Sequence, residues 1–244
     1  MTHSEIDVKK GANPVLAMQC LLQGLAWLKK PELRKFVVIP IVINLVIYVT
    51  FFSLGMVYLS DLIASFIPGW LSWLEWILWP LLFLSFLITG YFTFTLFANL
   101  IATPFYGKLA EKTLSLSKGA AVAPAEQPWS KVIFSELRRL GYLGIRALPL
   151  LLLFVIPGIN LLAPFLWVLF SAWGIVLEYM AYPLENEGLL FPEQRQLLKR
   201  IRLGALSFGG IVVLGLTIPV LNILVPPAAV IAATLYMEKI RKVQ

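Results

Sequence analysis

Two basic residues, Arg34 and Lys35, follow Pro31 just before the first long uncharged stretch of the chain. Proline is favoured in the first turn of a helix, where backbone N–H groups have no partner inside the helix. We therefore expect Glu32, Leu33 and Arg34 to offer free N–H groups, while the two basic side chains add positive charge. This arrangement suits an anion, because helix N-termini and guanidinium groups both bind anionic oxygens. The alternative is that these cations simply flank a membrane helix on its cytoplasmic side.

A second feature is a pair of helix-breaking motifs inside two later uncharged stretches. The sequence Ile-Pro-Gly-Ile-Asn at 156–160 recurs as Ile-Pro-Val-Leu-Asn at 218–222. A helix breaker with a polar neighbour inside an apolar stretch is typical of a chain that reverses within a membrane. We therefore expect two re-entrant hairpins with Asn160 and Asn222 at their tips. These two amides either cap the broken helix ends or line a narrow polar passage.

Two charged residues, Arg146 and Glu178, flank the first of these hairpins. A charge without a partner is costly at the edge of a membrane, so we expect the two side chains to form an ion pair beside the pathway. Glu178 is also the best carboxylate for a proton relay, because the one histidine, His3, lies in the polar N-terminal tail.

The sequence offers little that could support enzyme chemistry. One cysteine, Cys20, and one histidine, His3, exclude a disulfide framework and a zinc site of the His-Glu-x-x-His kind. The sequence also lacks a Walker A loop and a Gly-x-Gly-x-x-Gly fingerprint. We therefore predict no catalytic residues, no metal, no cofactor and no enzymatic activity.

Composition places these residues in a membrane protein. Of the 244 residues, 59% are hydrophobic and 14% are charged, whereas about 25% of the residues in a soluble domain are charged. The mean hydropathy is +0.85. The net charge of +7 fits lysine and arginine that face anionic lipid and the cytoplasm, so we expect membrane lipid, and not nucleic acid, as a partner. The charged residues within 1–11 are unlike a signal peptide.

The uncharged stretches predict an all-α integral membrane protein that forms a single membrane domain over residues 1–244. A hydrocarbon core of about 30 Å needs about 20 apolar residues in a helix, so two stretches qualify as spanning helices. The stretches that hold the helix breakers instead predict half-penetrating hairpins. The predicted elements are an N-terminal tail, interfacial helix and anion-site turn at 1–35, spanning helices at 36–60 and 76–107, and re-entrant hairpins at 147–177 and 203–237.

The distribution of lysine and arginine supports this topology. If 36–60 and 76–107 cross the membrane and each hairpin returns to the side it entered, all 20 basic residues fall on one side. Basic residues favour the cytoplasmic side, so we predict that both termini are cytoplasmic. In the alternative, the stretch at 147–177 crosses the membrane as two helices joined by a kink, and the basic residues that follow it face outward.

Five short motifs occur in an order that is typical of one known family. Pro-Glu-Leu-Arg-Lys-Phe precedes the first predicted span, and Ala-Asn-x-x-Ala-x-Pro-Phe ends the second. The other three motifs, among them Leu-Phe-Ser-Ala-Trp after Pro157-Gly158, lie in and between the predicted hairpins. With these motifs, over roughly residues 20 to 240, the chain resembles the CysZ family of bacterial sulfate permeases, within the broader EI24-like membrane proteins. The motifs begin at Pro31, Ala98, Val155, Tyr179 and Phe208.

The resemblance implies a channel-like permease that takes up sulfate across the bacterial inner membrane and supplies it for cysteine biosynthesis. It also implies a multi-pass homo-oligomer with a sulfate site at Glu32, Leu33, Arg34 and Lys35. Two positions depart from the family pattern, because Glu32 replaces a glycine and Lys35 replaces an arginine. A carboxylate repels sulfate and lysine lacks the bidentate fork of arginine, so we expect a weaker site. The alternatives are a sulfate-binding scaffold or regulatory subunit that does not conduct, and a proton-coupled sulfate symporter.

Overall fold

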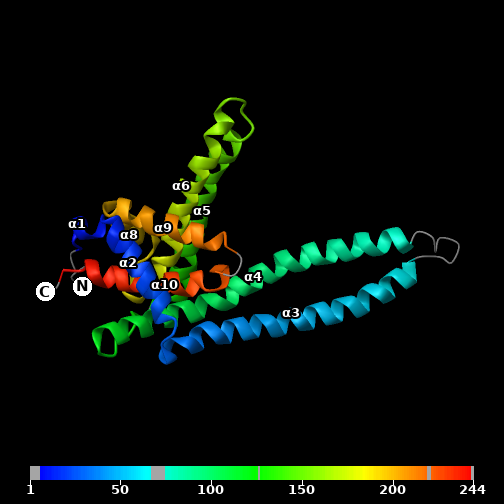
Figure 1. Cartoon of the computed structure of the whole chain (residues 1–244), viewed down its shortest axis with the longest axis horizontal. Coiled ribbons are helices and arrows are strands. Elements are labelled where there is room, and N and C mark those ends of the chain that lie inside the picture. Colours follow the sequence, from blue (N-terminus) through cyan, green and yellow to red (C-terminus); the bar gives the residue numbers. More distant parts are fainter. Residues whose placement is uncertain (1–5, 67–74, 126, 219–220, 243–244) are drawn as a thin grey trace. The chain divides into compact units, whose positions relative to one another are not determined.

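The computed structural model describes residues 6–66, 75–125, 127–218 and 221–242, and the regular elements in these ranges are helices (Figure 1). The predicted all-α class is therefore confirmed for the described residues. The α-helices are α1 (Val8–Gly11), α2 (Pro14–Trp27), α3 (Pro31–Phe66), α4 (Glu75–Lys118), α5 (Trp129–Leu153), α6 (Ala163–Tyr179), α7 (Ala181–Asn186), α8 (Phe191–Arg200), α9 (Arg202–Leu216) and α10 (Val225–Ile240), with short 3-10 helices η2 (Ile159–Leu161) and η3 (Leu221–Ile223).

Residue contacts divide the chain into two units. The first holds residues 1–34 and 106–244, and the second holds residues 35–105. Within the first unit an isolated β-bridge joins Ile6 to Arg241. The two ends of the described chain therefore lie side by side, which agrees with the prediction that both termini lie on the same side of a membrane. The single membrane domain over the whole chain stays a prediction.

The second unit consists of parts of two long helices, α3 and α4. Both predicted spanning helices, 36–60 and 76–107, lie inside them. α3 is longer than the predicted span, because its 36 residues extend about 54 Å at about 1.5 Å each. The Phe51 and Phe86 rings stack with their centroids 5.4 Å apart, so the two helices contact each other. Residues 67–74, between α3 and α4 in the sequence, lie outside the described residues.

Two described stretches, Pro31–Gly55 and Ala163–Asn186, are long and apolar enough to cross a membrane. The first overlaps the predicted span at 36–60. The second begins inside the first predicted hairpin, at 147–177, and extends beyond its end through α7. The span at 76–107 stays a prediction, because many of its side chains lie outside the described ones.

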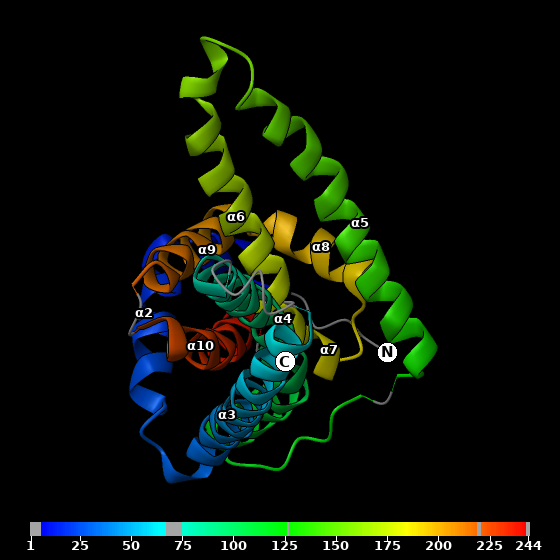
Figure 2. The ribbon, with the colours of Figure 1, turned by 90° about the vertical axis from the view of Figure 1, so that its right-hand side faces the viewer.

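The two predicted chain reversals are present in the first unit. α5 and α6 form one helical hairpin, and α9 and α10 form the other (Figures 1 and 2). Gly158 has a φ of +85°, a backbone conformation that favours glycine. Both turns repeat one hydrogen bond, from Asn160 N–H to the Ile156 carbonyl over 3.0 Å and from Asn222 N–H to the Ile218 carbonyl over 2.9 Å. The sequence repeat thus encodes a repeated turn, whose depth in a membrane stays a prediction.

The first hairpin begins earlier than predicted. We expected it at 147–177, but α5 runs from Trp129 to Leu153 and joins the basic segment to the apolar one in a single helix. Pro149 lies inside α5 without ending it. The difference arises because a change in charge content marks a membrane boundary, whereas a helix ends at capping and breaking residues.

The core of the first unit surrounds α10, whose residues from Val225 onward are nearly all buried. α2 packs on α10, and α6 packs on α9. Glycine permits both close approaches. A Cβ atom at Gly24 would overlap the Ala228 carbonyl oxygen, and one at Gly209 would overlap the Ala172 carbonyl oxygen.

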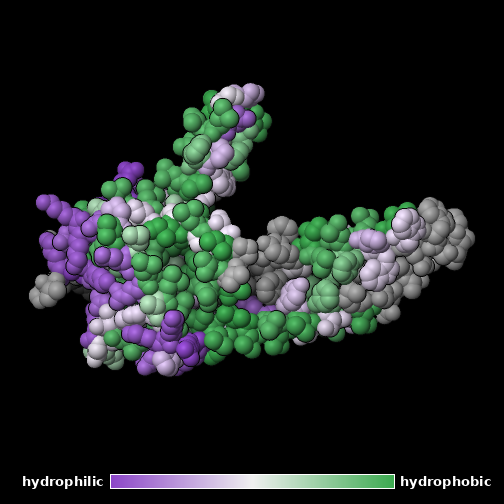
Figure 3. Space-filling model, in the orientation of Figure 1, coloured by the Kyte–Doolittle hydropathy of each residue, from purple (hydrophilic) through white to green (hydrophobic). Residues whose placement is uncertain are grey.

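The surface of the first unit is divided between polar and apolar areas. Hydrophilic side chains gather around the end that holds both termini, whereas the α5–α6 hairpin shows large hydrophobic areas (Figure 3). Leu161 and Phe165, near its turn, are 74% and 75% exposed. α2 also exposes an apolar face with Val15, Met18 and Leu22. Apolar surface of this kind contacts lipid or another subunit, and the interfacial position of α2 stays a prediction.

Candidate anion-binding site

The first turn of α3 carries the predicted anion site, and its backbone differs from the prediction. The helix begins at Pro31 as expected. The Lys30 carbonyl, however, accepts hydrogen bonds from the Leu33 N–H over 3.1 Å and from the Arg34 N–H over 3.2 Å. The prediction of three free donors is wrong, because the Arg34 amide makes the first i to i−4 bond of the helix. Of the three amides, that of Glu32 alone has no backbone partner among the described residues.

The side chains of this turn differ in exposure. Leu33 is fully buried and anchors the turn, whereas Glu32, Arg34 and Lys35 are exposed. The Lys35 ammonium lies 5.1 Å from the Phe36 ring centroid. Neither basic side chain has an ion pair within the described part of the chain, so both are open to an external anion. Sulfate binding by residues 32–35 stays a prediction.

Asn160 and Asn222 lie in the turns of the two hairpins, as predicted, and both are exposed. Their side chains cap neither the short 3-10 helix η2 nor the helices α6 and α10, as far as the described residues show. The two turns also lie apart in both views (Figures 1 and 2). One copy of the chain therefore does not bring the two amides to a common constriction.

Arg146 and Glu178 flank the α5–α6 hairpin but do not form the predicted ion pair. The Arg146 Nη1 donates to the Tyr142 carbonyl over 3.2 Å, and its guanidinium lies 3.7 Å from the Tyr142 ring centroid. The cation whose charge acts on Glu178 is Arg139. Because Arg139 Nη1 also donates to the Leu177 carbonyl over 3.4 Å, the middle of α5 packs beside this carboxylate, and the end of α5 does not.

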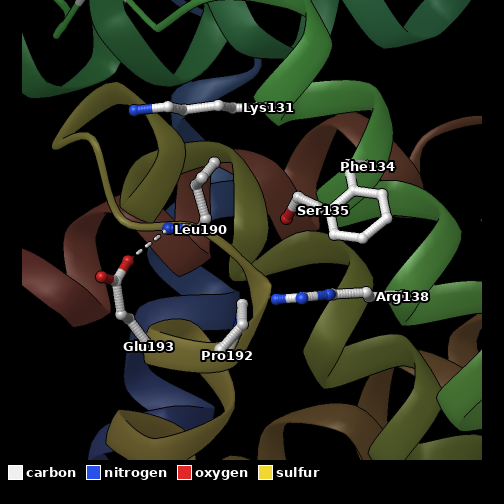
Figure 4. A pocket seen from close by; sticks show the side chains of 7 residues that line it. All are labelled: Lys131, Phe134, Ser135, Arg138, Leu190, Pro192 and Glu193. Carbon is white, nitrogen blue, oxygen red and sulfur yellow. Dashed lines mark hydrogen bonds between the residues drawn. The ribbon is translucent and has the colours of Figure 1, made fainter.

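Sequence reasoning missed a basic cluster on α5 and α8. Arg195 of α8 lies 5.1 Å from the centroid of the same Tyr142 ring that Arg146 covers. A cavity of about 300 Å³ opens between the start of α5 and the start of α8 (Figure 4). The spacing of cations and aromatics along α5 was visible in the sequence, but only folding brings α8 to them. The cavity is lined by Lys131, Phe134, Ser135, Arg138, Leu190, Pro192 and Glu193.

The described residues offer no metal centre. No three His, Cys, Asp or Glu side chains lie together among them. Cys20 is fully buried in α2, and burial raises the pKa of its thiol. A buried neutral thiol fills space and is a poor nucleophile, so its role is packing.

Comparison with known proteins identifies the family. The family described as "Sulfate transporter CysZ/Etoposide-induced protein 2.4" matches residues 20–227. The chain belongs to this family. The resemblance that the five motifs indicated is therefore confirmed.

Several members of the CysZ family are similar to this chain over most of their length. A sulfate transporter CysZ of Pseudomonas fluorescens (strain Pf0-1) is 41% identical over 93% of this chain and 95% of that protein. One of Pseudomonas aeruginosa (strain LESB58) is 38% identical over 89% of this chain and 92% of that protein. One of Pectobacterium atrosepticum (strain SCRI 1043) is 36% identical over 86% of this chain and 80% of that protein. The region matched by the family contains the first turn of α3 and both hairpin turns.

Proposed function

We propose that this protein is a channel-like permease that carries sulfate across the bacterial inner membrane and supplies it for cysteine biosynthesis. The observation that carries the proposal is the similarity, over nearly the whole chain, to proteins named sulfate transporter CysZ. The two long apolar stretches at Pro31–Gly55 and Ala163–Asn186 support a membrane location.

Sulfate docks first at the start of α3. Binding must replace the strong hydration of a dianion, and the exposed Arg34 guanidinium offers paired N–H donors for this purpose. Lys35 adds a compact positive charge, and the Glu32 N–H adds one backbone donor at the positive end of the helix dipole. The Glu32 carboxylate opposes these contributions, so binding is weaker than with a neutral residue at this position.

Several copies of the chain build the conducting path. Asn160 and Asn222 are exposed on turns that lie apart within one chain (Figures 1 and 2). They can therefore meet at one constriction only across subunits. Neutral amides suit such a constriction, because they hydrogen bond to an anion without trapping it. The exposed apolar side chains near the α5–α6 turn form a surface against which neighbouring subunits can pack.

The membrane potential works against sulfate entry. An inside-negative potential opposes each negative charge by about 2.3 kcal/mol per 100 mV, and sulfate carries two charges. Passive uptake therefore depends on a low internal concentration of sulfate, which assimilation into cysteine maintains. A proton-coupled symporter is the second candidate, because Glu178 is an exposed carboxylate at the end of α6 that lacks an ion pair among the described residues.

Uptake of radiolabelled sulfate into proteoliposomes tests the proposal. We expect saturable uptake that unlabelled sulfate suppresses, that an inside-negative potential slows and that a pH gradient leaves unchanged. Uptake that follows an inward proton gradient and is lost in Glu178→Gln would assign the symporter instead. Sulfate binding without uptake above that of empty liposomes would contradict a permease and indicate a non-conducting scaffold or regulatory subunit.

A further inference from the structure

One face of α5 carries basic and aromatic side chains in alternation. Its members are Lys131, Phe134, Arg138, Tyr142 and Arg146, and spacings of three and four residues place them on one side of the helix. The Arg138 guanidinium lies 4.4 Å from the Phe134 ring centroid, and that of Arg146 lies 3.7 Å from the Tyr142 ring centroid. Each ring thus holds a guanidinium in place by cation–π attraction.

α8 adds a further arginine to this face. The Arg195 guanidinium lies 5.1 Å from the Tyr142 ring centroid and 5.9 Å from that of Phe191. The two rings meet edge to face with their centroids 5.5 Å apart. Two guanidinium groups, from α5 and from α8, therefore gather at one tyrosine. We call Lys131, Arg138, Arg146 and Arg195 the α5–α8 basic face.

The cavity that two members of this face, Lys131 and Arg138, line has room for an anion. Lys131 and Arg138 extend from α5 across the cavity toward the segment at 190–193 (Figure 4). The carboxylate among its lining residues, Glu193, accepts a hydrogen bond from the Leu190 N–H over 2.8 Å through one oxygen, and its negative charge offsets part of the positive charge of Lys131 and Arg138. The volume of about 300 Å³ corresponds to about ten waters at about 30 Å³ each, enough for a sulfate that keeps part of its hydration.

The protein itself does not neutralise the α5–α8 basic face. None of its four members has an ion pair among the described residues, whereas Arg139, elsewhere on α5, pairs with Glu136 over 2.7 Å. The Arg195 Nε is buried and has no hydrogen-bond partner in the described structure. A buried donor on a charged group is costly to leave without an acceptor, so this guanidinium is not satisfied by the protein alone.

We propose that the α5–α8 basic face binds sulfate as a second oxyanion site, separate from the first turn of α3. The choice of sulfate rests on the proposed function, but the site is defined by binding and can be tested without transport. Guanidinium groups held by aromatic rings are already ordered, so little of their freedom is lost when they bind an oxyanion. A lipid phosphate presents similar oxygens and is the competing ligand, because apolar residues such as Leu137 and Ile145 are exposed on the same helix.

Equilibrium binding of radiolabelled sulfate to the purified full chain tests the proposal. The Arg34→Gln variant weakens the first site, and at sulfate concentrations too low to fill the weakened site we expect one bound sulfate per chain, against two in the unmodified protein. Adding Arg195→Gln should weaken this remaining site by about tenfold or more, the loss expected for a charged hydrogen bond. Arg200→Gln is the matched control, because Arg200 is exposed in the last turn of the same helix. It should leave the remaining affinity unchanged.

Two further variants separate binding from folding. Arg195→Lys should recover part of the affinity through its charge alone, because lysine restores the charge without the fork. If Arg195→Gln unfolds at room temperature, Arg146→Gln replaces it, since Arg146 is exposed. Loss of affinity in Arg146→Gln with an unchanged unfolding temperature would support the site.

Three results would overturn the proposal. The first is one sulfate per unmodified chain and none in Arg34→Gln. The second is an equal loss in Arg195→Gln and Arg200→Gln, which would indicate a diffuse charge effect. The third is an Arg195→Gln variant that binds sulfate with unchanged affinity but has lost the anionic phospholipid that co-purifies with the protein, as measured by mass spectrometry. That outcome would assign the face to lipid phosphate. If the protein takes up sulfate but the α5–α8 basic face binds none, only the second site is refuted. If the face binds sulfate but the protein takes up none, only the permease function is refuted.

Discussion

At the scale of single residues, the carboxylate of Glu32 opposes the cations that surround it in the first turn of α3. The Glu32→Gln substitution removes the negative charge and keeps the size of the side chain. We expect sulfate to bind about fivefold more tightly, because two unit charges about 4 Å apart in water interact by about 1 kcal/mol. Sulfate titrations at low and high ionic strength measure the effect. A gain that persists undiminished at high salt would contradict an electrostatic cause.

The buried thiol of Cys20 provides a second prediction at this scale. Because burial raises its pKa, the reactive thiolate is scarce near neutral pH. We expect a maleimide to label the folded protein at least about tenfold more slowly than the chain unfolded in detergent. The folded state holds the thiol proton more tightly, so this contribution to stability is present below the usual thiol pKa and is lost as pH rises through the raised value. Equal labelling rates would show that α2 does not bury Cys20.

The types of residue at the candidate sites were easier to predict than the residues that contact them in the folded chain. The start of α3 at Pro31 was predicted correctly. The Arg34 amide, however, was counted as a free donor, although it donates to the Lys30 carbonyl in the first turn of the helix. The prediction of an Arg146–Glu178 ion pair was wrong, because the register of α5 against α6 decides which arginine lies near the carboxylate. Arg195 was missed for a related reason, since its partner ring at Tyr142 lies in another helix.

At the scale of elements, the contact between α6 and α9 depends on one glycine. A Cβ at Gly209 would overlap the Ala172 carbonyl, whereas one at Gly210 would meet nothing within 4 Å. Alanine is otherwise favoured over glycine within a helix by about 1 kcal/mol. We therefore expect Gly209→Ala to lower the thermal unfolding temperature in detergent, and its matched control Gly210→Ala to keep or raise it. Equal shifts in the two variants would contradict the packing of α9 on α6.

Element positions could be predicted where the sequence carries a local signal. The repeated Ile-Pro-x-x-Asn pattern predicted both turns. Proline alone does not end a helix in this chain, since Pro104 and Pro149 lie inside α4 and α5. The start of α5 at Trp129 could not be read from the charge pattern. The basic residues of α5 belong to the same continuous helix as its apolar residues. The position of that helix in the fold depends on its packing against α6 and α8.

At the scale of the whole molecule, the topology in the membrane is the main prediction. Single cysteines in a Cys20→Ala background at Lys9, Lys118 and Lys199 should all react with a membrane-impermeant maleimide from the cytoplasmic side. These positions are exposed in the first unit. A cysteine at Leu161 should be protected from both sides if the α5–α6 hairpin is re-entrant. Labelling of that cysteine from the outside would instead show that the hairpin crosses the membrane.

The whole-molecule class was the most secure prediction, because it depends on composition and on the positions of many residues at once. Low charge content and long apolar stretches require a membrane environment whatever the packing details. The number of subunits could not be predicted, since it depends on how exposed surfaces such as that around Phe165 fit one another. Charge counting placed both termini together, and the bridge between Ile6 and Arg241 agrees with it.

The central claim is that sulfate transport begins at the first turn of α3. The most direct test is the dependence of uptake on sulfate concentration in proteoliposomes with the unmodified protein or Arg34→Gln. We predict that the half-saturating concentration rises about tenfold or more while the maximal rate is retained, because a charged hydrogen bond contributes about 1.5–3 kcal/mol to docking. Uptake with an unchanged half-saturating concentration would contradict the claim and move sulfate docking away from this turn.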